Sequence, residues 1–296
     1  MSSISTLGII LTLIASFGWG AMDVGQKAVM RRVDPMVVVV LLPLAEAPLL
    51  AIYAALAGPF VLPPMACLPM LGSATLNAVG LFCFMQALHR SPMSLTIPLL
   101  SLTPVMTTLL GWAFRHQVPG VPQVIGAILV VGGALVLGAK SPQWHGFRGF
   151  LREPGVPLML GASVAWSCTA IMDQTAFAYG AGVWYAPALT LCVGLIFSFF
   201  FVVSGKLLPT LQKARALAGF PGLALTVAVM GAAVIAVQIE SLRLVPAGLN
   251  ETVRRGLGMA CAIVSGRLFF KETITQRMVV AVVILTLGVA LVVGLR

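Results

Sequence analysis

The sequence predicts an all-α membrane protein whose ten transmembrane helices form two inverted repeats of five helices each. Three observations lead to this fold class. The 296 residues are 59% hydrophobic and only 9% charged, whereas a soluble domain is about a quarter charged. The apolar residues are gathered in ten long runs, as transmembrane helices of about 20 residues require. The two halves of the chain also share short motifs in the same order.

The runs are continuous and too long for the alternating strands of a membrane barrel, which have about 10 residues. The first run has no basic residues before it, so we expect a retained span and not a cleaved signal peptide. The ten predicted spans are 5–29, 35–57, 64–88, 91–113, 121–139, 154–179, 182–204, 217–243, 246–270 and 274–295.

Turn residues punctuate the spans in chain order. Pro35 and Pro64 open the second and third spans, and Pro119 precedes the fifth. Pro98 and Pro104 lie inside the fourth span and predict kinks there. Pro142 lies in the break between the halves, Pro209 lies in the break after the seventh span, and Pro246 opens the ninth span. No connection is long enough for a soluble catalytic domain.

A repeated motif closes the fifth and tenth spans. Residues 132–138 read GGALVLG and residues 288–294 read GVALVVG, so that five of seven positions are identical. Trp19 in the first span likewise corresponds to Trp166 in the sixth. Because each repeat has an odd number of spans, the second copy must be inverted, as in many secondary transporters. The predicted units are a first repeat at 1–140, a short loop at 141–153 and a second repeat at 154–296.

Two motifs resemble a known family. Residues 99–106 read LLSLTPVM and are followed by LGW at 110–112, and the ninth span ends GRLFFKE at 266–272. Both are similar to segments of the drug/metabolite transporter superfamily, of the type with two EamA-like domains. Arg115-His116 depart from the Gly-Glu pair usual there. The resemblance implies export or exchange of small metabolites, and it does not fix the substrate.

Charged residues inside the spans are the candidate functional residues, because each costs about 2.5–3.5 kcal/mol at the centre of a membrane helix. In the ninth span, Asn250 and Glu251 precede Arg254 and Arg255. Glu251 and the two arginines are three and four residues apart, a spacing that puts side chains on one helix face. A guanidinium suits a carboxylate or a phosphate. We interpret this group as a substrate or gating site, with a static internal salt bridge as the alternative.

Four acidic residues are candidate ion-coupling sites: Glu46, Asp23, Asp173 and Glu240. Glu46 lies between two prolines of the second span with no nearby partner in the sequence, so it is a proton-coupling candidate or a partner of the ninth span, with a static inter-helix hydrogen bond as the alternative. Asp23 and Lys27 are four residues apart and can form an ion pair. Candidates for the wall of a substrate cavity, with simple packing as the alternative, are Trp19, Trp166, Gln86 and Gln238.

Signatures of other functions are absent from the sequence. The three histidines have no metal-binding spacing, the cysteines have no paired spacing, and no nucleophile elbow or Walker loop is present. We therefore predict neither an enzyme nor a metal or cofactor site. The net charge of +10 comes mostly from loops between spans, which argues against nucleic-acid binding.

These loop charges also predict an orientation. The connections between odd and following even spans carry thirteen Lys and Arg residues, against three on the other side. Cytoplasmic loops are the richer in Lys and Arg, so both termini should lie outside the cytoplasm. We predict a multi-pass protein of a bacterial inner membrane.

The resulting hypothesis is a secondary transporter that acts as a monomer or a homodimer in contact with membrane lipids. It would export or exchange a small polar or charged metabolite by alternating access, with protons as a candidate coupling ion. Two alternatives remain: a flippase-like carrier of a lipid-linked phosphate or sugar, and a membrane scaffold or sensor that transports nothing.

Overall fold

The computed structural model describes residues 6–115, 119–138, 147–214, 221–244 and 247–294. Within these residues all regular structure is helical. The helices of the first half are α1 (Thr6–Met30), α2 (Pro35–Ala57), α3 (Pro64–Arg90), α4 (Met93–Thr96), the 3-10 helix η1 (Ile97–Ser101), α5 (Leu102–Arg115) and α6 (Val121–Gly138). Those of the second half are α7 (Phe147–Arg152), α8 (Gly155–Ala178), α9 (Tyr185–Val203), α10 (Leu207–Ala214), α11 (Pro221–Leu244), α12 (Ala247–Phe270) and α13 (Gln276–Gly294).

All ten predicted spans coincide with helical structure, and most boundaries agree within three residues. Six helices are long and apolar enough to cross a membrane, and four shorter apolar helices accompany them among the described residues. Two short helices, α7 and α10, lie in stretches that were predicted to be loops. The prediction of an all-α polytopic membrane protein is confirmed.

Local sequence explains where the helices begin. The Asp34 side chain accepts a hydrogen bond from the Met36 N–H at 2.9 Å, and Pro35 occupies the first turn of α2. This combination favours a helix start, because proline needs no hydrogen-bond partner there. Pro64 begins α3 in the same way.

The fourth predicted span is broken into α4, η1 and α5. Pro98 lies within η1, and Pro104 lies in the first turn of α5. Serine side chains of α8 bind this irregular stretch: Ser163 Oγ donates to Leu99 O at 3.2 Å, and Ser167 Oγ donates to Thr103 O at 3.1 Å. The kink predicted from the prolines is therefore a 3-10 segment bound to a neighbouring helix.

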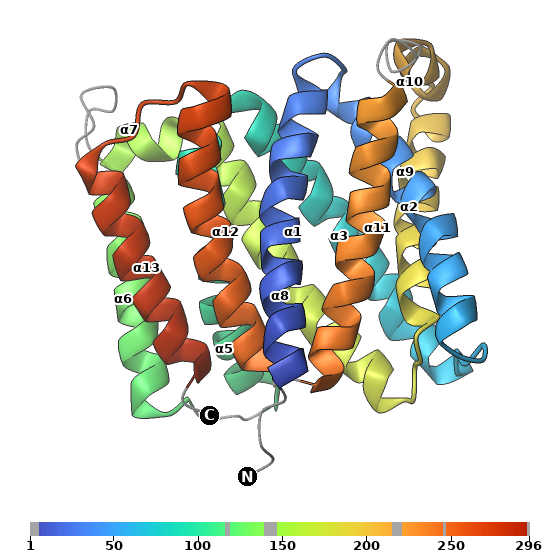
Figure 1. Ribbon diagram of the computed structural model, residues 1–296, viewed down its shortest axis with the longest axis horizontal. Helices are drawn as coiled ribbons and strands as arrows, with labels where there is room; N and C mark the ends of the chain where they lie inside the picture. The colour runs from blue at the N-terminus through green and yellow to red at the C-terminus, as the bar shows by residue number, and fades with distance from the viewer. Residues whose placement is uncertain (1–5, 116–118, 139–146, 215–220, 245–246, 295–296) are drawn as a thin grey trace.

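The helices stand side by side in one bundle (Figure 1). α1 and α8 run in opposite directions, and α6 and α13 form one edge of the bundle. Each contact between the two halves has a counterpart in which the halves are exchanged. α3 packs on α8, and α11 packs on α1. α3 contacts α9, α11 contacts α2, and α6 pairs with α13. The fifth and tenth predicted spans thus lie together at the periphery.

The repeated motif forms the contact between α6 and α13. A side chain at Gly288 would approach the Val130 backbone nitrogen to 2.7 Å. Small residues permit such close backbone approach between membrane helices. The motif therefore serves helix packing.

Candidate functional site

The first candidate site lies where α1, α11 and α12 meet. Trp19 donates its indole N–H to the Gln238 Oε1 at 3.1 Å. The Arg254 guanidinium lies over the Trp19 ring, with its central carbon 5.6 Å from the ring centroid. This distance is within the range of a cation–π interaction. Three predicted residues from three helices are thus brought together, and all three side chains are partly exposed. We call these residues the Trp19 cluster.

Other predicted members of this site lie outside the described side chains. Asn250, Glu251 and Arg255 are part of α12, but their side chains are not described. The substrate or gating role of this group, and its alternative as a static salt bridge, stay predictions.

Glu46 on α2 is buried, with 5% of its surface exposed. Its Oε1 has no hydrogen-bond partner among the described residues. The carboxyl group faces α11 at Gly231, where any side chain would collide with it, and the Met22 side chain of α1 lies beside the same position. The predicted carboxylate of the second span therefore lies at a contact of three helices that belong to different halves of the chain.

Asp173 is held at a second contact between the halves. Its Oδ1 accepts hydrogen bonds from Ser73 Oγ on α3 and from the Tyr185 hydroxyl, each at 2.5 Å. Asn77 adds a hydrogen bond to Ser73 Oγ at 3.2 Å. Glu240 on α11 likewise accepts a hydrogen bond from the Tyr53 hydroxyl of α2.

Sequence reasoning missed these tyrosines. The chain has only three tyrosines. Two of them, Tyr53 and Tyr185, donate hydrogen bonds to carboxylates on other helices. A scan for rare hydroxyl groups in apolar spans could have identified Tyr53 and Tyr185 as polar residues of the bundle, although it could not have assigned their partners.

A third polar contact lies at the end of the bundle where α1 ends and α13 begins, which we call the basic end. Lys27 Nζ forms an ion pair with Glu272 Oε1 at 2.8 Å and donates to Ser91 O at 3.3 Å. Glu272 also accepts hydrogen bonds from the Met93 and Ser94 backbone N–H groups, each at 3.0 Å. The ion pair of Lys27 is with Glu272, and the predicted pairing of Lys27 with Asp23 stays a prediction.

The surroundings of Glu272 favour its ionised form. Burial raises the pKa of this carboxyl group, but the hydrogen bonds from Lys27 and Ser94 and the charge of Lys27 outweigh burial, so the pKa lies below its usual value. Lys27 and Arg31 both lie over the Phe270 ring, at 5.0 and 4.4 Å from its centroid. Glu272 was not a predicted site residue, although the FFKE motif contains it.

Further predicted residues lie on α1, α3 and α8. Trp166 packs against Phe84 with ring centroids 5.4 Å apart and lies over Gly80 of α3. Gln86 is buried on α3. Asp23 lies one helical turn from Trp19 on α1 and is partly exposed. Among the described residues, no group of three His, Cys, Asp or Glu side chains is placed to hold a metal ion.

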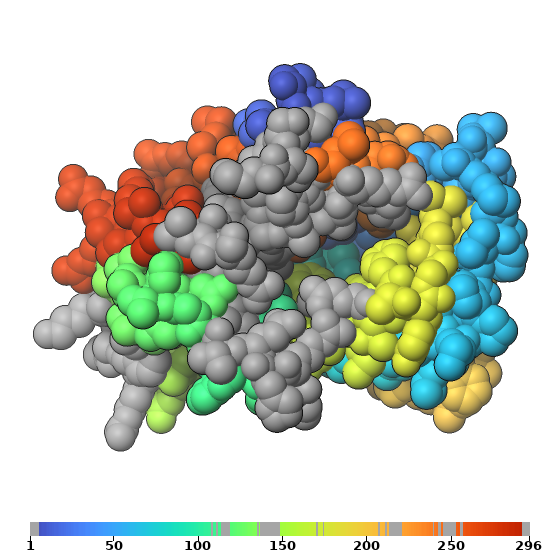
Figure 2. Space-filling view, turned by 90° about the horizontal axis from the view of Figure 1, so that it is seen from below, coloured from blue at the N-terminus to red at the C-terminus, as the bar shows by residue number. Residues whose placement is uncertain are grey.

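Seen from the end of the bundle where α1 begins, the surface is hollowed between the yellow residues of α8 and α9 and the orange residues of α11 (Figure 2). Deeper segments are visible at the bottom of this hollow. The basic end, with its ion pair, lies on the opposite side of the bundle (Figure 1).

Comparisons with known proteins agree with the resemblance seen in the sequence. Residues 6–139 match the model of the EamA-like transporter family. An uncharacterized protein of Methanocaldococcus jannaschii is 32% identical over 69 residues, which are 23% of this chain and 50% of that protein. The matched part thus spans half the length of this curated relative. A protein solved by crystallography aligns with a TM-score of 0.59 at 15% identity, over 96% of this chain and 95% of its own. It has the same fold.

Proposed function

Residues 6–139 belong to the EamA-like transporter family, and from this premise we propose that the chain is a secondary exporter of a small polar or charged metabolite. Family membership makes it a membrane transporter of the drug/metabolite type. The substrate class, the direction of transport and the coupling to protons belong to the proposal.

The Trp19 cluster carries the proposal for the substrate site. It combines a cation, an aromatic ring and an amide at the meeting point of three helices. A guanidinium supplies directed hydrogen bonds to a carboxylate or phosphate, while the ring supplies an apolar face. This chemistry suits a metabolite with an anionic group and an apolar part.

Alternating access is supported by the placement of polar contacts between the halves. Lys27–Glu272 joins the first half to the second at the basic end. Ser73–Asp173 and Tyr53–Glu240 join the halves through α3, α8, α2 and α11. The exchange of packing partners described above supports two repeats at 1–140 and 154–296 that move against each other. In this proposal the hollow in Figure 2 is the open vestibule, and the ion pair closes the opposite end.

Transport by purified full-length protein in liposomes tests the proposal. We would measure uptake of labelled amino acids, organic acids and nucleosides, and separately the flipping of a fluorescent phospholipid. Arg254→Gln should lower solute flux about tenfold or more, because a hydrogen bond to a charged group contributes about 1.5–3 kcal/mol. Trp19→Phe, which keeps the ring but removes the N–H group, should have the smaller effect.

Arg152→Gln is the matched control, because it removes an exposed arginine of α7. Wild-type flux in Arg254→Gln would refute the assignment of the Trp19 cluster. Lipid flipping without solute transport would instead favour a lipid carrier, and neither activity would favour a scaffold.

A further inference from the structure

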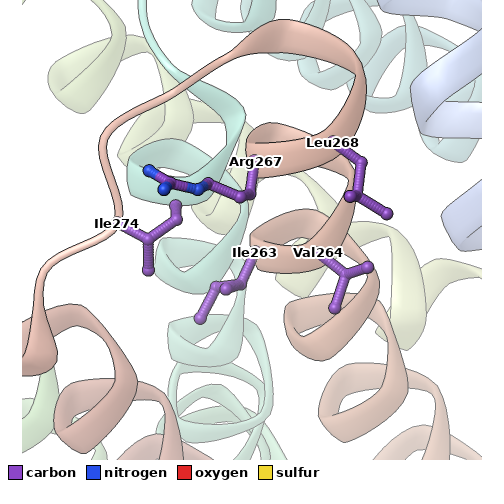
Figure 3. A pocket seen from close by; sticks show the side chains of 5 residues that line it. All are labelled: Ile263, Val264, Arg267, Leu268 and Ile274. Atoms are coloured by element: carbon purple, nitrogen blue, oxygen red, sulfur yellow. The ribbon is translucent and has the colours of Figure 1, made fainter.

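An open groove lies beside the end of α12, away from the Trp19 cluster. Its volume is about 360 Å³, and its lining residues are Ile263, Val264, Arg267, Leu268 and Ile274. Figure 3 shows the Arg267 side chain reaching from α12 toward Ile274, while the other four lining side chains are aliphatic. The groove therefore combines an apolar wall with a single cation.

No ion pair of the described residues neutralises the charge at this groove. Arg267 is exposed, and no carboxylate of the described residues lies within ion-pair distance of it. Glu272 is the nearest acidic residue along the chain, and its carboxylate is directed to Lys27, Met93 and Ser94. The exposed Lys271 follows Arg267 by four residues and adds positive charge to this part of the chain.

The apolar wall continues onto a surface that faces hydrocarbon in a membrane. Val264, Leu268 and Phe269 are 55%, 68% and 64% exposed. Arg267 lies one turn before the end of α12 at Phe270. Its guanidinium therefore lies near the boundary between the acyl chains and the headgroups of the lipids. Long basic side chains at this depth extend toward the interface.

We propose that this groove binds one anionic phospholipid. Its phosphate lies on Arg267, and one acyl chain lies along Ile263, Val264 and Leu268. Charge complementarity selects an anionic headgroup over a zwitterionic one, because basic pockets at the ends of membrane helices attract anionic lipids. The site is independent of the substrate, since it lies on the outer face of α12.

Native mass spectrometry of the full-length protein in detergent tests this assignment, with phosphatidylglycerol and phosphatidylcholine of equal chain length as probes. We expect the wild type to retain phosphatidylglycerol preferentially, with a preference that weakens at high salt. Arg267→Gln should weaken phosphatidylglycerol binding about fivefold, as expected for the loss of one surface cation. Arg267→Lys should retain most of the binding.

Two controls separate the site from general attraction to a basic protein. Lys206→Gln removes an exposed lysine outside the groove and should leave binding unchanged. Soluble glycerol phosphate should not compete, because it lacks the acyl chain. Equal binding of both lipids, or wild-type retention of phosphatidylglycerol by Arg267→Gln, would overturn the proposal.

Discussion

Polar side chains within the bundle fall into two groups. Some bind a partner on another helix, such as Asp173 with Ser73 and Tyr185. Glu46 differs, because its Oε1 is buried without a hydrogen-bond partner among the described residues. Burying an ionised carboxylate without a partner is unfavourable. Glu46 is therefore the residue at which we test the predicted coupling to protons.

Glu46→Gln tests this role in coupling. If a proton bound to Glu46 moves against the solute, transport is faster when the receiving side is the more acidic. The amide cannot exchange a proton, so we expect Glu46→Gln to lose this response to an imposed pH gradient. The measurement is solute flux in liposomes with and without the gradient.

Glutamine has nearly the shape of protonated glutamate, so folding and expression should be unaffected. Asp34→Asn is a useful control, because Asp34 is an acidic residue at the start of α2 rather than within a span. A wild-type response to the gradient in Glu46→Gln would rule out this residue as the coupling site.

The sequence identified many of these residues but few of their contacts. Trp19, Gln238 and Arg254 are conspicuous because polar groups are rare in apolar spans. Their partnership could not be predicted, since Trp19 and Gln238 are 219 residues apart. Lys27 and Glu272 are separated by 245 residues, and reasoning from helix spacing led instead to Asp23. Local periodicity carries no information on such distant pairs.

Helices could be predicted more completely than contacts. Prolines, glycines and long apolar runs fix where a membrane helix begins and ends, so the ten spans agree with the structure. The internal form of the fourth span depends on tertiary contacts. Ser163 and Ser167 of α8 bind its carbonyl groups, and this support is invisible in the sequence of the span itself. The short helices α7 and α10 were missed because their runs are too short for a periodic signal.

The α6–α13 contact provides a test at the level of helices. Gly132 and Gly288 occupy equivalent positions of the repeated motif, but only Gly288 is in close contact. A side chain at Gly288 would meet the Val130 backbone, whereas one at Gly132 has nothing within 4 Å. We expect Gly288→Ala to destabilise the protein by about 1–3 kcal/mol through overpacking.

Gly132→Ala is the matched control. It changes the same motif position in the other half and gains helix propensity of about 1 kcal/mol, so it should be neutral or stabilising. Thermal unfolding in detergent measures both variants. Equal effects of the two substitutions would mean that the close approach of α6 and α13 is not required.

For the whole molecule, the distribution of charge predicts the orientation in the membrane. Arg31, Arg152, Arg267 and Arg277 all lie at the end of the bundle where α1 ends. Because cytoplasmic ends are rich in Lys and Arg, we expect this end to face the cytoplasm. A reporter enzyme active only outside the cytoplasm, fused after Arg296, should then be active.

A fusion after Arg32, between α1 and α2, should give the opposite result. Activity of this reporter at both positions would show that one segment does not cross the membrane.

The Lys27–Glu272 ion pair joins the two halves at the basic end, and we expect it to keep this end closed. If the pair keeps this end closed, its loss should expose the α3–α4 connection more often. Lys27→Met removes the cation, and Glu272→Ala also removes the acceptor for Met93 and Ser94. We expect faster hydrogen exchange at the Met93 and Ser94 amides, by about tenfold or more in Glu272→Ala, because each charged hydrogen bond contributes about 1.5–3 kcal/mol.

Reversal of the charges distinguishes the ion pair from the backbone contacts. The double variant Lys27→Glu with Glu272→Lys restores an ion pair, but a lysine cannot accept hydrogen bonds from Met93 and Ser94. If the ion pair alone closes the basic end, exchange throughout residues 266–275 returns to the wild-type rate while the Met93 and Ser94 amides stay fast. If the backbone contacts close it, both regions stay fast. Unchanged exchange in both single variants would show that the two halves are held together elsewhere, through α6 and α13.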